Sequence, residues 1–173
     1  MDVLASYLLV DGYNIINSWE ELKEIQKYSL EDARDKLMEL IENYRAYKGI
    51  KAILVFDAHL VKGSKEKHLT YGGLEVVYTK ENQIADEYIE KFVDEYGKLY
   101  YITVATSDWL EQQVVLGRGA VRISSRELKR EVYKAKKAMK ERYKLSKIPK
   151  IDNLEDRIDK NILEELEKMR REP

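Results

Sequence analysis

Four aspartates in this sequence are spaced as if to meet at one edge of a β-sheet. Asp11, Asp57 and Asp108 stand at or just after the ends of apolar runs, and Asp86 lies early in a segment with helical spacing. Ligands of parallel α/β sheets bind beyond the carboxyl ends of the strands. Carboxylates held close together repel unless a cation neutralises them. The pattern therefore predicts a site for Mg²⁺ or Mn²⁺, where a metal-activated water can attack a phosphodiester.

Each of these residues also has a simpler interpretation. An aspartate after a strand often caps a helix or forms a turn, and Asp86 shares its helical stripe with two other acids, as a solvated face would. Asn14 is either a turn residue or a group that orients Asp11. Trp109 is expected in the core rather than as a platform for bases.

Other chemistries lack the residues that they need. There is no cysteine, which excludes disulfides, cysteine–zinc sites and thiol catalysis. The two histidines, His59 and His68, are not accompanied by a nucleophile elbow. Neither a dinucleotide-binding nor a nucleoside-triphosphate glycine motif is present, so no nucleotide cofactor is expected.

The elements that position the aspartates alternate between strand and helix. This alternation predicts an α/β fold with a mostly parallel sheet of about five strands flanked by helices. We expect Ser18 to cap the first helix, Ser29 to cap the second and Gly49 to end it. A polar, mobile loop is expected over 58–73. The expected strands are 7–10, 52–56, 74–79, 99–105 and 120–123, and the expected helices are 18–27, 29–49, 81–97, 108–116 and 125–147.

Charge is distributed unevenly although the net charge is only −1. Residues 126–147 hold ten basic and three acidic residues, which leaves the remainder of the chain acidic. A basic helix beside an acidic body is typical of a nucleic-acid binder, and a solvated surface helix is the alternative. The residues expected to contact nucleic-acid phosphates are Lys129, Arg130, Lys136, Lys137 and Lys140 of this helix, with Lys62, Lys65 and Lys67 of the loop.

The length of 173 residues suits one compact domain with a short appendage. We expect one α/β domain over 1–147, including the basic helix, and a charged helical tail over 148–173 that begins near the break at Pro149. The first residues lack the basic region of a signal peptide, and no segment approaches the roughly 20 apolar residues of a membrane span. A cytoplasmic protein without a membrane partner is therefore expected.

Four segments in order resemble the NYN domain, a branch of the PIN-like ribonucleases. They are Leu9–Asn14 (LVDGYN), Val55–Ala58 (VFDA), Ala85–Ile89 (ADEYI) and Ala105–Asp108 (ATSD). The length and the basic helix resemble the bacterial YacP-like subfamily, over roughly residues 6–145.

The resemblance implies a PIN-like fold and metal-dependent endonucleolytic cleavage of RNA, with messenger RNA as substrate and the ribosome as a partner. It assigns Asp11, Asp86 and Asp108 as metal-binding catalytic acids, and Asn14 and Ser107 as the polar residues beside them. Asp57 is the candidate for a fourth acid.

Three competing hypotheses stay open at this point. A non-catalytic RNA- or ribosome-binding protein would bind RNA without metal and without cleavage. A small-molecule phosphohydrolase would use the same acids, but it leaves the basic helix unexplained. A purely structural role would make the aspartates helix caps.

Overall fold

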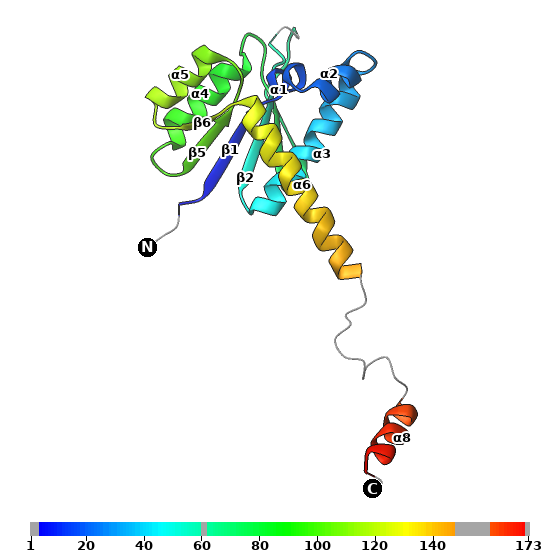
Figure 1. Ribbon diagram of the computed structural model, residues 1–173. Helices are drawn as coiled ribbons and strands as arrows, with labels where there is room; N and C mark the ends of the chain where they lie inside the picture. The colour runs from blue at the N-terminus through cyan, green and yellow to red at the C-terminus, as the bar shows by residue number, and fades with distance from the viewer. Residues whose placement is uncertain (1–3, 60–61, 148–159, 172–173) are drawn as a thin grey trace. The chain divides into compact units, whose positions relative to one another are not determined.

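The computed structural model describes residues 4–59, 62–147 and 160–171 (Figure 1). The chain divides into two compact units, 1–136 and 137–173. The strands are β1 (Ser6–Asp11), β2 (Lys51–Phe56), β3 (Lys67–Tyr71), β4 (Leu74–Tyr78), β5 (Tyr101–Ala105) and β6 (Val121–Ile123). The helices are α1 (Gly12–Ser18), α2 (Glu20–Gln26), α3 (Leu30–Lys48), α4 (Ala85–Tyr96), α5 (Trp109–Gly117), α6 (Ser125–Lys147) and α8 (Lys160–Arg171).

The first unit is built on one six-stranded sheet in the order β3-β4-β2-β1-β5-β6. All neighbouring strands are parallel except β3 and β4, which form an antiparallel hairpin at one edge. The predicted α/β class with a mostly parallel sheet is confirmed. The expected count of five strands is one short, because β3 lies inside the segment that the sequence predicts as a loop.

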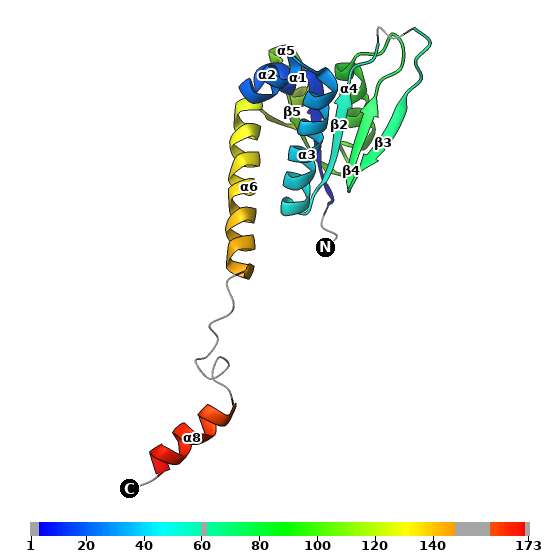
Figure 2. The ribbon, with the colours of Figure 1, turned by 90° about the vertical axis from the view of Figure 1, so that its right-hand side faces the viewer.

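Helices cover both faces of this sheet (Figure 2). On one face α1, α2, α3 and the first turns of α6 bury the larger apolar cluster, which includes Trp19, Leu37 and Leu128. On the other face α4 and α5 pack on Leu9, Val55 and their neighbours. The inner strands are buried on both sides, which explains why they read as continuous apolar runs.

The chain changes direction at β1. From β1 it crosses by α1–α3 to β2 on one side, and it later returns from β4 by α4 to β5 on the other side. Where crossovers leave a parallel sheet on opposite faces, a crevice opens at the carboxyl ends of the strands. The ends of β1 and β5, together with the first turns of α4 and α5, therefore meet at this crevice.

Two predicted helix boundaries are confirmed and two are wrong. The Ser29 hydroxyl caps α3 by accepting the Asp32 N–H at 3.1 Å, and Gly49 ends α3 with φ +66°. Ser18 does not cap α2. It closes the unexpected helix α1, and its hydroxyl bonds the Ser125 hydroxyl, while Trp19 holds the N-cap position. The helix expected from residue 81 begins at 85.

After residue 147 the structure describes only α8. The break expected at Pro149 and the start of the predicted terminal helix lie outside the described residues. Within the described ranges, no helix combines the length and the apolar character that crossing a membrane requires.

Candidate active site

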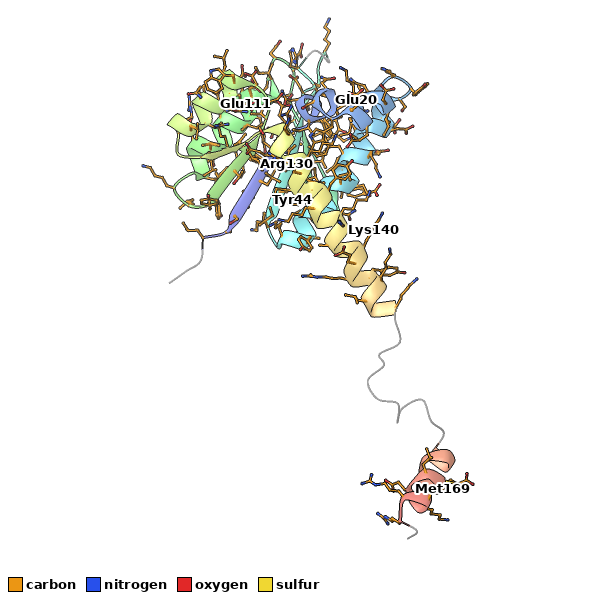
Figure 3. All side chains as sticks on the ribbon, in the orientation of Figure 1. Glu20, Tyr44, Glu111, Arg130, Lys140 and Met169 are labelled. Carbon is orange, nitrogen blue, oxygen red and sulfur yellow. The ribbon has the colours of Figure 1, made fainter. Side chains whose placement is uncertain are left out.

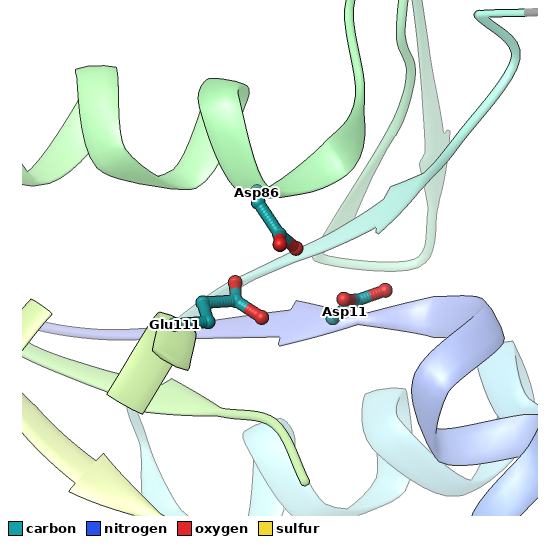
Figure 4. Close-up of side chains that lie close together, drawn as sticks. All are labelled: Asp11, Asp86 and Glu111. Carbon is teal, nitrogen blue, oxygen red and sulfur yellow. The ribbon is translucent and has the colours of Figure 1, made fainter. Parts of the chain in front are cut away.

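Three carboxylates meet at the crevice. Asp11 ends β1, Asp86 lies in the first turn of α4 and Glu111 lies in the first turn of α5. One carboxylate oxygen of each lies within 4.8 Å of the others, and the close-up shows the three side chains pointing toward one another (Figure 4). Segments 100 residues apart in the sequence thus supply a single acidic cluster.

Asp11 is held at the junction of β1 and α1. It is the N-cap of α1 and accepts the Asn14 N–H, although at a long 3.5 Å. The turn needs glycine next, because a Cβ on Gly12 would lie 2.5 Å from a Phe56 ring carbon and 3.0 Å from the Val55 carbonyl oxygen. Burial, followed by repulsion from Asp86, raises the pKa of Asp11 from 3.8 to about 7.

Glu111 is the most deeply buried of the three, with 3% of its surface exposed. Neither of its carboxylate oxygens has a hydrogen-bond partner among the described residues. Burial, followed by repulsion from Asp11 and Asp86, raises its pKa from 4.5 to about 9. A buried, unpaired carboxylate costs folding free energy unless a counter-charge neutralises it.

A divalent cation fits this cluster. The donors are all carboxylate oxygens, which Mg²⁺ and Mn²⁺ prefer. The unpaired oxygens of Glu111 lie beside Asp11 and Asp86, so an ion bound among them would pair oxygens that the protein leaves bare. Within the described residues, no lysine, arginine or histidine forms an ion pair with Asp11, Asp86 or Glu111.

Asn14 and Ser107 lie at the same edge and bond to each other. The Ser107 N–H and hydroxyl donate to Asn14 Oδ1 at 2.7 and 2.8 Å. The loop between β5 and α5 is also anchored to α5, since Gln112 Nε2 donates to the Thr106 carbonyl at 2.7 Å. These bonds connect the start of α1 to the loop before α5. They thereby fix the position of the helix that carries Glu111 relative to Asp11.

Among the described residues, the carboxylate cluster consists of Asp11, Asp86 and Glu111, and Asp108 does not belong to it. Its Oδ1 accepts the N–H groups of Leu110 at 2.9 Å and of Glu111 at 3.3 Å, so it caps α5. Asp57 accepts the His59 N–H at 2.9 Å and contacts the His59 ring, and its charge adds to the raised pKa of Asp11.

Sequence reasoning did not include Glu111 and misplaced Trp109. Glu111 occupies the first turn of a helix that follows a strand, which is the relation that identified Asp86, so the signal was present. The sequence pattern indicated Asp108 as the third metal-binding acid, because it is an aspartate just after a strand and lies three residues before Glu111. Trp109 was expected in the core, but it is 65% exposed.

Replacing Asp108 separates its two possible roles. If it acts as the cap of α5, Asp108→Ser should retain the cap and leave the RNA cleavage that is expected from the sequence largely unchanged, because serine caps about as well as aspartate. Asp108→Ala should then cost about 0.5–2 kcal/mol of stability. Thermal melts and RNA cleavage by both variants check this. A loss of activity in the serine variant as severe as that in Asp86→Asn would instead make Asp108 a metal ligand.

The predicted RNA-contacting residues fall into two groups. Arg130, Lys137 and Lys140 are exposed on α6, where Figure 3 labels Arg130 and Lys140. Lys129 is partly buried, and its ammonium contacts Glu21 at 2.8 Å. Lys136 lies over the Tyr133 ring. Lys62, Lys65 and Lys67 are exposed, and Lys67 is the first residue of β3 rather than part of a loop.

The comparison with protein families decides the identity of the fold. The model of the YacP-like NYN domain matches residues 8–171. The chain belongs to the YacP-like NYN domain family. This NYN domain is of the nuclease type, and the match extends past residue 147, where the sequence predicts that the domain ends.

Individual relatives agree with this assignment. The chain is 49% identical over 126 residues to YacP of Bacillus subtilis, described as an uncharacterized protein, covering 72% of this chain and 74% of the relative. The crystal structure of B. subtilis Rae1 (YacP) matches with a TM-score of 0.71–0.72 and 42% identity. The wild-type comparison covers 99% of this chain and 95% of that one, and a mutant covers 83% and 86%. The expected PIN-like fold is confirmed.

Proposed function

We propose that this NYN domain is a metal-dependent endoribonuclease that hydrolyses RNA phosphodiester bonds. The observation that carries the proposal is the convergence of Asp11, Asp86 and Glu111, with the buried oxygens of Glu111 unpaired. The family supports it, because NYN domains are nuclease-type domains. Messenger RNA is the proposed substrate and the ribosome the proposed setting, which would place the protein in the cytoplasm.

Asp11, Asp86 and Glu111 would hold one or two Mg²⁺ or Mn²⁺ ions. When bound, such an ion supplies a Lewis acid that lowers the pKa of water and offsets the charge of the phosphodiester. The three carboxylates fix the position of this charge, since each comes from a different rigid element. The Asn14–Ser107 pair aligns the two halves of the site, and the Asp108 cap holds the turn that carries Glu111.

RNA binding is proposed to use the exposed cations described above. Phosphate contacts from lysine and arginine carry no sequence information, and they release counterions. This grip matches a nuclease that needs to hold many sequences. Arg130 and its neighbours on α6 contribute most in this proposal, because Lys129 already pairs with Glu21.

Cleavage of labelled RNA tests the proposal directly. The protein is incubated with single-stranded RNA, free and together with ribosomes, in Mg²⁺, in Mn²⁺ and in a chelator. The expected result is internal cleavage that the chelator abolishes. RNA binding that persists in the chelator, with no cleavage under any condition, would make the protein a binding module. Turnover of a simple phosphate ester with RNA left intact would make it a phosphohydrolase.

Charge reversal on α6 tests the RNA grip. Arg130→Glu and Lys137→Glu should weaken RNA binding similarly for unrelated sequences. Each lost phosphate contact should also reduce the slope of log affinity against log salt by about 0.7. Fluorescence anisotropy across a salt series measures both effects. Lys23→Glu on α2 is the matched control. An equal loss of RNA affinity in this variant would show that the effect comes from net charge and would contradict a specific RNA contact by α6.

A further inference from the structure

Two large apolar side chains are exposed in the same helical turn that carries Glu111 of the acidic cluster. Trp109 is 65% exposed and Leu110 is 74% exposed, and both belong to the first turn of α5. Glu111, the next residue, is almost fully buried in the cluster. The other tryptophan, Trp19, is 1% exposed and donates its ring N–H to the Ser125 carbonyl at 2.9 Å, so it serves the core. The exposed pair contributes no comparable burial.

The backbone that carries this pair is fixed relative to the cluster. Asp108 accepts the N–H groups of Leu110 and Glu111, and Ser107 bonds Asn14 next to Asp11. Side chains of a helix lean toward its N-terminus, so those of the first turn of α5 lean toward the edge of the sheet where the cluster lies. Trp109 and Leu110 therefore present an exposed apolar surface, carried on a fixed backbone, at the edge that holds the acids.

We propose that Trp109, supported by Leu110, is a stacking platform for a base of single-stranded RNA that neighbours the phosphate being cleaved. The proposal rests on the function proposed above. A base offers a flat apolar face to an exposed ring, and unpaired RNA bases commonly stack on aromatic side chains. Stacking tolerates every base, which suits a site whose other contacts are carboxylates and phosphate-binding cations. Trp109 is a positioning residue in this proposal and leaves the metal chemistry unchanged.

Intrinsic fluorescence tests the platform, because Trp19 is buried and Trp109 is the exposed reporter. The full chain is titrated in a chelator with a short single-stranded RNA and with a ribose-phosphate oligomer of equal length that lacks bases. The expected result is a change of Trp109 fluorescence with RNA and little change with the abasic oligomer. Anisotropy of labelled RNA gives the dissociation constant independently.

Substitutions complete the test. Trp109→Ala should weaken RNA binding by roughly tenfold, within the range for loss of one stacked base, and should not alter binding of the abasic oligomer. Trp109→Phe should restore most of the affinity. Leu116→Ala, an exposed apolar residue in the last turn of the same helix, is the matched control and should bind like the wild type.

The outcomes separate this proposal from the nuclease function. RNA that binds equally to the wild type and Trp109→Ala, with unchanged fluorescence, overturns the platform and would leave α5 as a surface for a protein partner. Cleavage by the same preparation would still support the nuclease. An absence of RNA binding also overturns the platform. The nuclease function is tested separately, by whether RNA cleavage depends on the metal ion.

Discussion

Glu111→Gln is expected to lower RNA cleavage at least about 100-fold while the domain stays folded. Glutamine keeps the shape of the side chain, but it removes one of three charges that would hold the cation. Changes to groups that merely support metal ligands already cost 10–100-fold in affinity or activity, so the loss of a direct ligand should cost more. Initial rates of cleavage at saturating Mn²⁺ measure the effect.

Glu87→Gln is the matched control for this variant. Glu87 is an exposed acid next to Asp86 in the first turn of α4, and it does not belong to the cluster. Its substitution removes the same charge near the site and should leave the rate within about twofold, as expected for a surface change. Wild-type activity in Glu111→Gln would show that the buried acid does not take part in catalysis.

The metal-free protein is expected to lose stability as the pH rises from about 4 to about 9. The pKa of Asp11 is raised from 3.8 to about 7 and that of Glu111 from 4.5 to about 9. Between the unfolded and folded pKa of each group, the folded state holds more protons than the unfolded chain. The free energy of unfolding therefore falls with rising pH in this window.

Glu111→Gln should flatten this dependence, since its amide stays neutral. In a chelator at about pH 4 the variant and the wild type should melt nearly alike, because Glu111 is then largely protonated in the unfolded as well as the folded state. At pH 9 the variant should melt higher. Even one pKa unit is ~1.4 kcal/mol, which corresponds to a rise in Tm of roughly 3–6 °C for a domain of this size. Calorimetric scans at both pH values decide the matter, and equal melting at pH 9 would contradict the unfavourable burial of Glu111.

Sequence patterns predicted the parts of the fold that apolar burial dictates. The inner strands β1 and β2 contain continuous apolar runs because helices cover both faces, and β4 and β5 are apolar except at Glu75 and Thr103. The hairpin strand β3 escaped this reasoning, since all five of its residues are exposed and show no apolar run. The pair Gly72-Gly73, with φ +61° at Gly72, forms the two-residue hairpin turn between β3 and β4, a signal that the prediction from sequence did not use. Helix α1 was missed because it follows β1 without a loop, since Asp11 is both the last residue of the strand and the N-cap of the helix.

The candidate site was likewise predictable only in part. Asp11 and Asp86 could be placed at the crevice from the alternation of strands and helices, since topology alone brings their elements together. The choice between Asp108 and Glu111 depends on which way each side chain turns within one helical turn. Asp108 turns back to the N–H groups of α5, while Glu111 turns inward to Asp11. The exposure of Trp109 depends on the same turn, and an average preference of tryptophan for the core did not predict it.

Titration calorimetry with Mn²⁺ on the wild type, Asp86→Asn and Glu87→Gln tests the central claim most directly, because it needs no substrate. The account predicts binding by the wild type and Glu87→Gln and its loss in Asp86→Asn. It also predicts proton release on binding near pH 7, seen as a heat that varies with the buffer, since the raised pKa values leave protons on Asp11 and Glu111. Wild-type protein that binds no Mn²⁺ or Mg²⁺, or an Asp86→Asn variant that binds as the wild type does, would contradict a metal site at these carboxylates.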